Sequence, residues 1–189
     1  MTATARVPTY VALLRAVNVG GRGVVTMDRV RAAFQRAGAH NVQTVLQSGN
    51  VIFDVGQSEV DDIVAEARKR IGRLIGAEPE VIVRSASQVC TIVDKAPFAR
   101  MPPSPSVKLY VVFLPKAPRR KPALPLTSTA EALEVIQMTG REVFVVSRMK
   151  PVGVFGFPNA FVENRLGLPA TSRNWSTVST LAELLNRRG

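Results

Sequence analysis

The chain has 189 residues, of which 46% are hydrophobic, so it can bury one sizeable core or two small ones and is not a disordered protein. The net charge of +11 favours polyanionic partners, although charge alone identifies none. A single cysteine and a single histidine exclude an internal disulfide and a Cys/His metal cage, and they disfavour a Ser-His-Asp triad. We therefore expect no metal site and no cofactor.

The first predicted elements are a strand and a helix. An apolar run at residues 10–14 predicts the strand, and Thr26 can cap a helix that ends at Gly38. Two β-branched runs follow, at residues 42–46 and 51–55. They are separated by a short polar segment, which predicts a hairpin.

A second helix and a further strand complete the first half. Ser58 with Asp61 resembles a capping box, and the amphipathic stripe behind it is closed by Gly76. Residues 80–84 predict the last strand of this half. The order is then βαββαβ, the split βαβ or ferredoxin-like pattern, in which the helices cover one face of an antiparallel sheet.

The second half is less regular. Ser85 or Ser87 can start a short helix that runs to Asp94, and a proline-rich connection leads to a strand at residues 107–114. A basic, proline-rich segment, KAPRRK at residues 116–121, follows this strand. A solvated connector and a nucleic-acid contact are the two interpretations of that segment, and the connector is favoured.

Alternating apolar and polar residues around Gly140 predict a hairpin of residues 131–138 and 141–147, with a helix at 130–137 as the alternative. Helices are predicted at residues 158–166 and 176–187. The fold class is therefore α+β, with a ferredoxin-like βαββαβ N-terminal half over residues 1–85. A second, smaller α+β subdomain with a C-terminal helix is predicted over residues 86–189.

The location expected by default is cytoplasmic. No apolar run approaches the roughly 18 residues that a membrane span needs, and the N-terminus lacks the features of a signal peptide. We expect no membrane association, and the sequence does not predict an oligomeric state.

Three polar blocks have a similar composition: RAVNVGG at residues 15–21, QSGN at 47–50 and TSRNW at 171–175. Their combination, in this order and at this chain length, resembles the domain of unknown function 1697 family. The resemblance runs from VALLRAVNVGG through LQSGNVIF to GLPATSRNWSTVSTL. It implies a cytoplasmic bacterial protein with a ferredoxin-like α+β architecture and no established catalytic residues.

Each block allows a binding interpretation and a structural one. Gly20 and Gly21 can expose backbone N–H groups to an anion or form a turn before the first helix. In the second block Gly49 and Asn50 fit a hairpin turn, whereas a simple turn does not need Gln47 or Ser48.

In the third block Arg173 stands beside a predicted helix N-terminus, which favours a carboxylate or phosphate. The alternative is that Arg173 pairs with groups of the protein itself and that Trp175 packs into the core.

None of the three blocks contains Asp, Glu, His, Lys or Cys, which disfavours acid/base catalysis. The sequence therefore predicts binding of a small anionic or nucleotide-like ligand. Nucleic-acid binding through the basic surface is the alternative, and an enzyme of unknown reaction is the third hypothesis. The predicted ligand contacts are Arg15, Asn18, Gly20, Gly21, Gln47, Ser48, Asn50, Arg173, Asn174 and Trp175.

Overall fold

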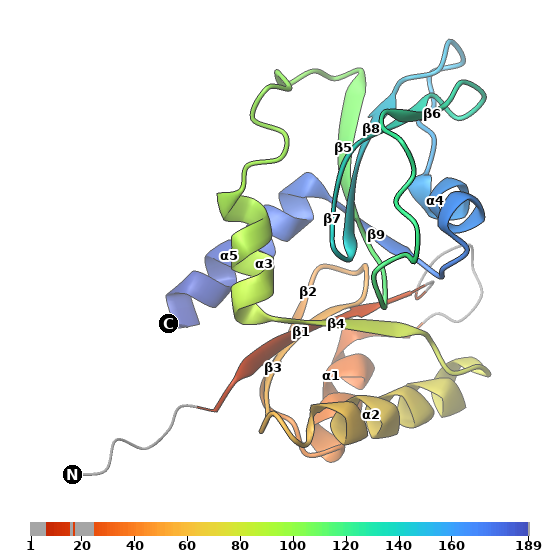
Figure 1. Ribbon diagram of the computed structural model, residues 1–189. Coiled ribbons are helices and arrows are strands. Elements are labelled where there is room, and N and C mark those ends of the chain that lie inside the picture. Colours follow the sequence, from red (N-terminus) through yellow and green to blue (C-terminus); the bar gives the residue numbers. More distant parts are fainter. Residues whose placement is uncertain (1–6, 16, 18–24, 189) are drawn as a thin grey trace. The chain divides into compact units, whose positions relative to one another are not determined.

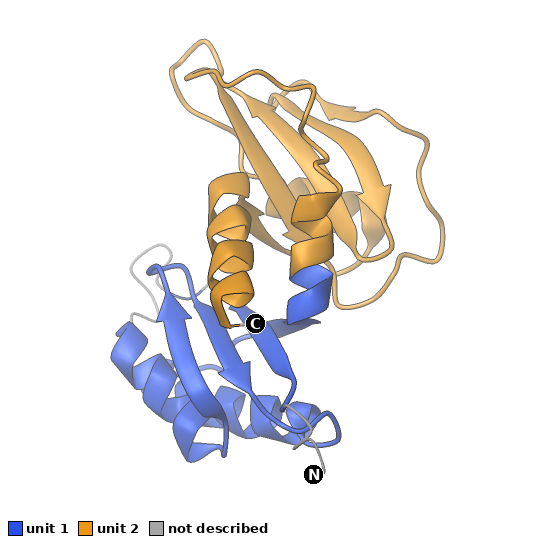
Figure 2. Ribbon diagram, turned by 90° about the vertical axis from the view of Figure 1, so that its left-hand side faces the viewer, with its two compact units in different colours: residues 1–89 blue, residues 90–189 orange. Residues whose placement is uncertain are grey.

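The computed structural model describes residues 7–15, 17 and 25–188. Their contacts divide the chain into two compact units, Met1–Val89 and Cys90–Gly189, which we call unit 1 and unit 2 (Figure 2). The division falls inside helix α3 (Ala86–Asp94), and the predicted boundary between residues 85 and 86 lies at the start of this helix.

Unit 1 contains a four-stranded antiparallel sheet. Its strands are β1 (Thr9–Leu14), β2 (His40–Val45), β3 (Asn50–Asp54) and β4 (Val81–Ser85), in the spatial order β2-β3-β1-β4. The hydrophobic strand β1 is central and pairs with both β3 and β4. This order and the chain order βαββαβ confirm the predicted ferredoxin-like architecture.

Helices α1 (Met27–Arg36) and α2 (Val60–Ile75) cover one face of this sheet (Figure 1). The oxygen of Thr26 accepts a hydrogen bond from the amide of Arg29 at 3.4 Å, which confirms the predicted cap of α1. Phe34 of α1 packs on Phe53 of β3 with ring centroids 5.2 Å apart, so the apolar stripe of the helix forms the core with the sheet.

The start of α2 differs from the prediction. Its N-cap residue is Glu59, which makes no side-chain capping bond, so the expected capping box of Ser58 with Asp61 is wrong. Ser58 lies one residue too early to cap a helix that begins at Val60, and Asp61 is instead an acid in the first turn, where it interacts favourably with the helix dipole. The predicted closure at Gly76 is confirmed, with a φ of +85°.

Unit 2 contains a five-stranded antiparallel sheet in the order β6-β7-β8-β5-β9. Its strands are β5 (Val107–Phe113), β6 (Leu126–Ser128), β7 (Leu133–Thr139), β8 (Glu142–Arg148) and β9 (Thr171–Asn174). The hairpin of β7 and β8 is confirmed, and the alternative helix at residues 130–137 is not formed.

The helices of unit 2 complete its core. Phe161 and Val162 of α4 (Pro158–Leu166) pack on one face of the sheet, with Tyr110 and its same-face neighbours. On the opposite face the ring of Phe98 contacts the ring of Phe144, at 5.9 Å between centroids. Helix α5 (Trp175–Arg188) buries an apolar stripe of Val178, Leu181 and Leu185, as its periodicity predicts. Within the described part of the chain, no helix is both long and apolar enough to span a bilayer.

Candidate functional site

The first two polar blocks meet in unit 1 at the end of strand β1. The amide of Leu14 donates a hydrogen bond of 2.8 Å to the carbonyl oxygen of Gly49, and Gly49 has a φ of +72°. A Cβ atom at position 49 would lie 3.0 Å from Cβ of Leu14. Glycine is therefore required here by backbone conformation and by close packing, and the QSGN turn lies directly against the strand end that leads into Arg15.

Arg15 forms a surface ion pair in this region. Its Nη1 lies 3.0 Å from Oε2 of Glu80, and the two side chains are 33% and 48% exposed. The amide of Arg15 also donates to the carbonyl oxygen of Glu80 at 2.8 Å, since β1 and β4 are neighbours in the sheet. An ion pair as exposed as this contributes only about 0–1 kcal/mol to stability, so an incoming anion can compete with Glu80 for Arg15.

The turn of the second block divides into a buried part and an exposed part. Asn50 is fully buried, and its Nδ2 donates to the carbonyl oxygen of Val45 at 2.8 Å and to Oγ of Ser48 at 3.0 Å. These bonds close the turn, which favours the structural interpretation of Asn50. Gln47 and Ser48 are exposed at the surface.

Asn18, Gly20 and Gly21 lie outside the described residues. As ligand contacts they remain predictions.

The third block forms strand β9 at the edge of the sheet of unit 2. Arg173 stands opposite Val111 of β5 and is only 6% exposed. Its Nη1 donates to Oγ1 of Thr171 at 2.9 Å and to the carbonyl oxygen of Ser172 at 2.8 Å. Burial lowers the pKa of the Arg173 guanidinium to about 10, so the side chain still carries its charge at neutral pH.

The other two residues of the third block lie at the start of α5. Trp175 is half-buried, and its ring packs edge-on against Phe98 with centroids 5.2 Å apart. Asn174 is exposed and immediately precedes the helix. The contacts of Arg173 and Trp175 thus favour the structural interpretation of these two residues, whereas Asn174 is exposed.

Sequence reasoning missed Glu80 as the partner of Arg15. Residue 80 was expected only as the first residue of a strand, and the signal for the pairing lies in the sheet order, which places β4 beside β1. The pairing joins residues 65 positions apart, so local patterns do not indicate it.

Glu80, the ion-pair partner of Arg15, is a carboxylate in contact with the first block. Among the described residues, no group of three or more His, Cys, Asp or Glu side chains could hold a metal ion. The thiol of Cys90 is 3.4 Å from Oδ1 of Asn186, to which it donates. Burial, and after it the charge of Asp94, raises the pKa of Cys90, which is opposite to the shift that activates a nucleophilic thiol.

The chain belongs to a family described as "Protein of unknown function (DUF1697)", whose model matches residues 7–144. The match includes the first two blocks and ends before the third. A solved structure, that of the conserved bacterial protein SP0830 from Streptococcus pneumoniae, is similar with a TM-score of 0.57 and 20% sequence identity. The similarity covers 95% of this chain and 99% of that one, and it concerns the fold. No curated protein matches the chain.

Proposed function

We propose that this member of the DUF1697 family binds a small anionic or nucleotide-like ligand, with Arg15, Gln47 and Ser48 as its contacts in unit 1. The observation that carries the proposal is the packing of the QSGN turn against the end of β1, through the bond between Leu14 and Gly49. This packing holds two exposed polar side chains on a turn whose shape is fixed by the buried Asn50. Rigid support of this kind lowers the entropic cost of binding.

Arg15 supplies the charge in this proposal. A guanidinium forms paired hydrogen bonds with a phosphate or carboxylate, whereas Gln47 and Ser48 can hydrogen-bond either an anion or the polar edge of a base. Glu80 is a competing group, because its carboxylate pairs with Arg15 in the structure. Asn18, Gly20 and Gly21 belong to the same block as Arg15 and complete the proposed contact set.

Taken by itself, unit 2 offers a second, separate candidate contact surface, Asn174 and Trp175 at the N-terminus of α5. Arg173 contributes the field of a buried cation rather than a direct contact, because only 6% of the residue is exposed. The helix N-terminus adds partial positive charge in the same place. Asn174 can hydrogen-bond an anion, and Trp175, which is half-buried, is the aromatic residue that could stack on a ring.

A thermal-shift screen of phosphorylated metabolites in 150 mM NaCl, including inorganic phosphate and adenosine monophosphate, tests the proposal. A ligand present at 100 times its dissociation constant should stabilise the protein by about 2.7 kcal/mol, which is readily seen as a rise in melting temperature. The rise should be smaller in Arg15→Ala. If no anion stabilises the protein, or if Arg15→Ala responds as the native chain does, the proposal fails.

A second candidate function is nucleic-acid binding, and one observation favours it. In unit 2 the KAPRRK segment and the end of α4 line a hollow of about 570 Å³, with Lys116, Arg119, Arg120 and Arg165 among its side chains. A basic concave surface of this kind attracts a phosphodiester backbone.

The second candidate is tested by fluorescence anisotropy with a labelled single-stranded oligonucleotide at 50 and 200 mM salt. If the hollow binds the oligonucleotide, binding should persist at 200 mM salt. In Lys116→Gln/Arg119→Gln the logarithm of the binding constant should fall less steeply with the logarithm of the salt concentration, by about 0.7 in slope for each phosphate contact removed. Loss of all binding at 200 mM salt would leave only general charge attraction.

A further inference from the structure

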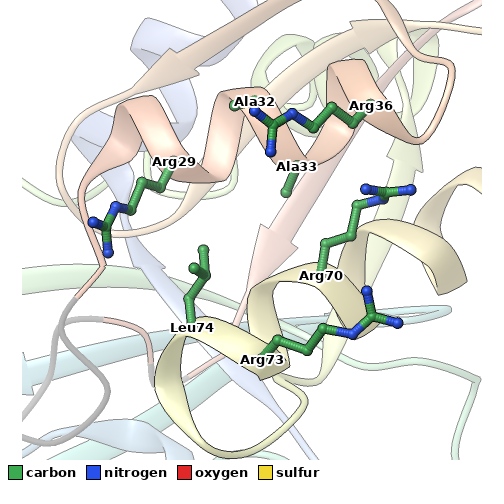
Figure 3. A pocket seen from close by; sticks show the side chains of 7 residues that line it. All are labelled: Arg29, Ala32, Ala33, Arg36, Arg70, Arg73 and Leu74. Atoms are coloured by element: carbon green, nitrogen blue, oxygen red, sulfur yellow. The ribbon is translucent and has the colours of Figure 1, made fainter.

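A second concave basic surface lies in unit 1, between the two helices that cover its sheet. Four arginines line a groove of about 460 Å³, Arg29 and Arg36 from α1 and Arg70 and Arg73 from α2 (Figure 3). We call it the arginine groove. Figure 3 shows Arg70 and Leu74 pointing from α2 toward α1. None of the described residues of the three polar blocks lines the groove.

Helix geometry explains why the arginines gather here. Positions 29 and 36 are seven apart and positions 70 and 73 are three apart, so each pair lies on one face of its helix. Between the two arginines of α1 stand Ala32 and Ala33, which also line the groove. Their small side chains leave space that a larger apolar residue would fill.

The charge of the groove is only partly balanced by the protein. Nε of Arg70 lies 2.8 Å from Oε1 of Glu66, close enough for an ion pair although not in hydrogen-bonding geometry. In the part of the chain that the structure describes, no ion pair involves Arg29, Arg36 or Arg73. By contrast, Arg31 on the outer surface of α1 pairs with Asp28 at 3.0 Å.

Like charges held in a concavity repel one another and raise the local positive potential. A bound anion removes this repulsion, and each guanidinium can form paired bonds to phosphate oxygens. One phosphate group carries at most two negative charges, so three uncompensated arginines match a ligand with two or more phosphates. The volume also lies within the range of about 300–1,000 Å³ that is usual for small-molecule sites.

We propose that the arginine groove is a binding site for a small ligand carrying two or more phosphate groups. The site is separate from the one proposed around Arg15, and it does not depend on that proposal. The alternative is that these arginines are independent solvated side chains, which predicts that any loss of positive charge from unit 1 weakens anion binding equally.

Isothermal titration calorimetry with inorganic tripolyphosphate in 150 mM NaCl tests the site. The variant is Arg36→Gln/Arg73→Gln, and the matched control is Arg31→Gln/Lys69→Gln, which removes the same charge from the same two helices outside the groove. The groove variant should bind at least about tenfold more weakly, because two charge-assisted hydrogen-bonding groups are lost. The control should stay within about twofold, since salt screens distant charges.

Equal weakening in both variants, or no saturable binding to the native chain, would overturn the proposal. Thermal denaturation of the free proteins checks folding, and the groove variant should melt no lower than the native chain because it loses repulsion. A short single-stranded oligonucleotide distinguishes the source of the phosphates. If the oligonucleotide binds the groove and tripolyphosphate does not, the small-ligand assignment is wrong. The response of Arg15→Ala in the thermal-shift screen does not bear on this result.

Discussion

Two arginines from blocks of similar composition are used in opposite ways. Arg15 in unit 1 is partly exposed and bound to a carboxylate that solvent also reaches, whereas Arg173 in unit 2 is buried and bonded to its own strand. The first can exchange its partner for a ligand at small cost. The second holds its partners within the fold. A polar block therefore marks a binding surface only where the fold leaves its side chains exposed.

The largest expected effect separates the two arginines by stability. Arg173→Ala should lower the free energy of unfolding by about 2–4 kcal/mol, because it leaves a cavity and removes the donor to Oγ1 of Thr171 and to the carbonyl oxygen of Ser172. Arg15→Ala should lower it by no more than about 1 kcal/mol. Urea denaturation of both variants measures the difference, and equal losses would contradict the comparison.

Arg173→Met sharpens this test, since it keeps most of the volume and removes the buried charge. It should be more stable than Arg173→Ala. Because burial lowers the pKa of Arg173 to about 10, below its unfolded value, the charge of Arg173 costs stability at neutral pH, and that cost is relieved as the pH rises through 10. The stability of the native chain relative to Arg173→Met should therefore increase above pH 10.

The same comparison applies within the QSGN turn. Asn50→Ala should lower the free energy of unfolding by about 1–3 kcal/mol, because the buried carbonyl of Val45 loses its donor. Gln47→Ala, at the exposed side of the turn, should change it by no more than about 0.5 kcal/mol. Chemical denaturation measures both, and a stable Asn50→Ala would mean that Asn50 does not hold the turn.

The smallest expected difference in the free energy of unfolding is between substitutions in a turn of unit 1 and in a turn of unit 2. Gly49 and Gly140 both have positive φ, but a Cβ at position 140 has no neighbour within 4 Å. Gly140→Ala should therefore show only the conformational cost, about 1–2 kcal/mol, while Gly49→Ala should lose about 1 kcal/mol more through its contact with Leu14. Equal losses of stability in thermal denaturation would show that a Cβ atom at position 49 is accommodated beside Leu14 without cost.

Periodicity was enough to predict most of the fold. These patterns are the apolar stripes of α1, α2 and α5 and the alternation around Gly140. They are visible in the sequence because burial of one face of a helix or strand sets the spacing of apolar residues that are close together in the chain. Strands β6 and β9 were not predicted. Strand β9 is a short polar segment that becomes a strand because β5 offers an edge to pair with, and β6 lies in a proline-rich segment and pairs with β7.

The candidate site was only partly predictable for the same reason. Polar residues after β1 and in the hairpin turn indicated a surface, but their partners come from the sheet order. The bond between Leu14 and Gly49 and the ion pair of Arg15 with Glu80 both join distant parts of the chain. The burial of Asn50 and Arg173 likewise depends on tertiary packing.

The central claim is that Arg15 exchanges Glu80 for an anionic ligand. Calorimetric titration of the anion that stabilises the native chain most should show about tenfold weaker binding in Arg15→Gln, the loss of one charge-assisted pair, and tighter binding in Glu80→Gln, where the competitor is gone. Arg31→Gln and Asp28→Asn are the matched controls, since they alter an ion pair of the same length on α1. Tighter binding in Glu80→Gln but not in Asp28→Asn is the predicted result, and equal changes in both pairs would contradict it.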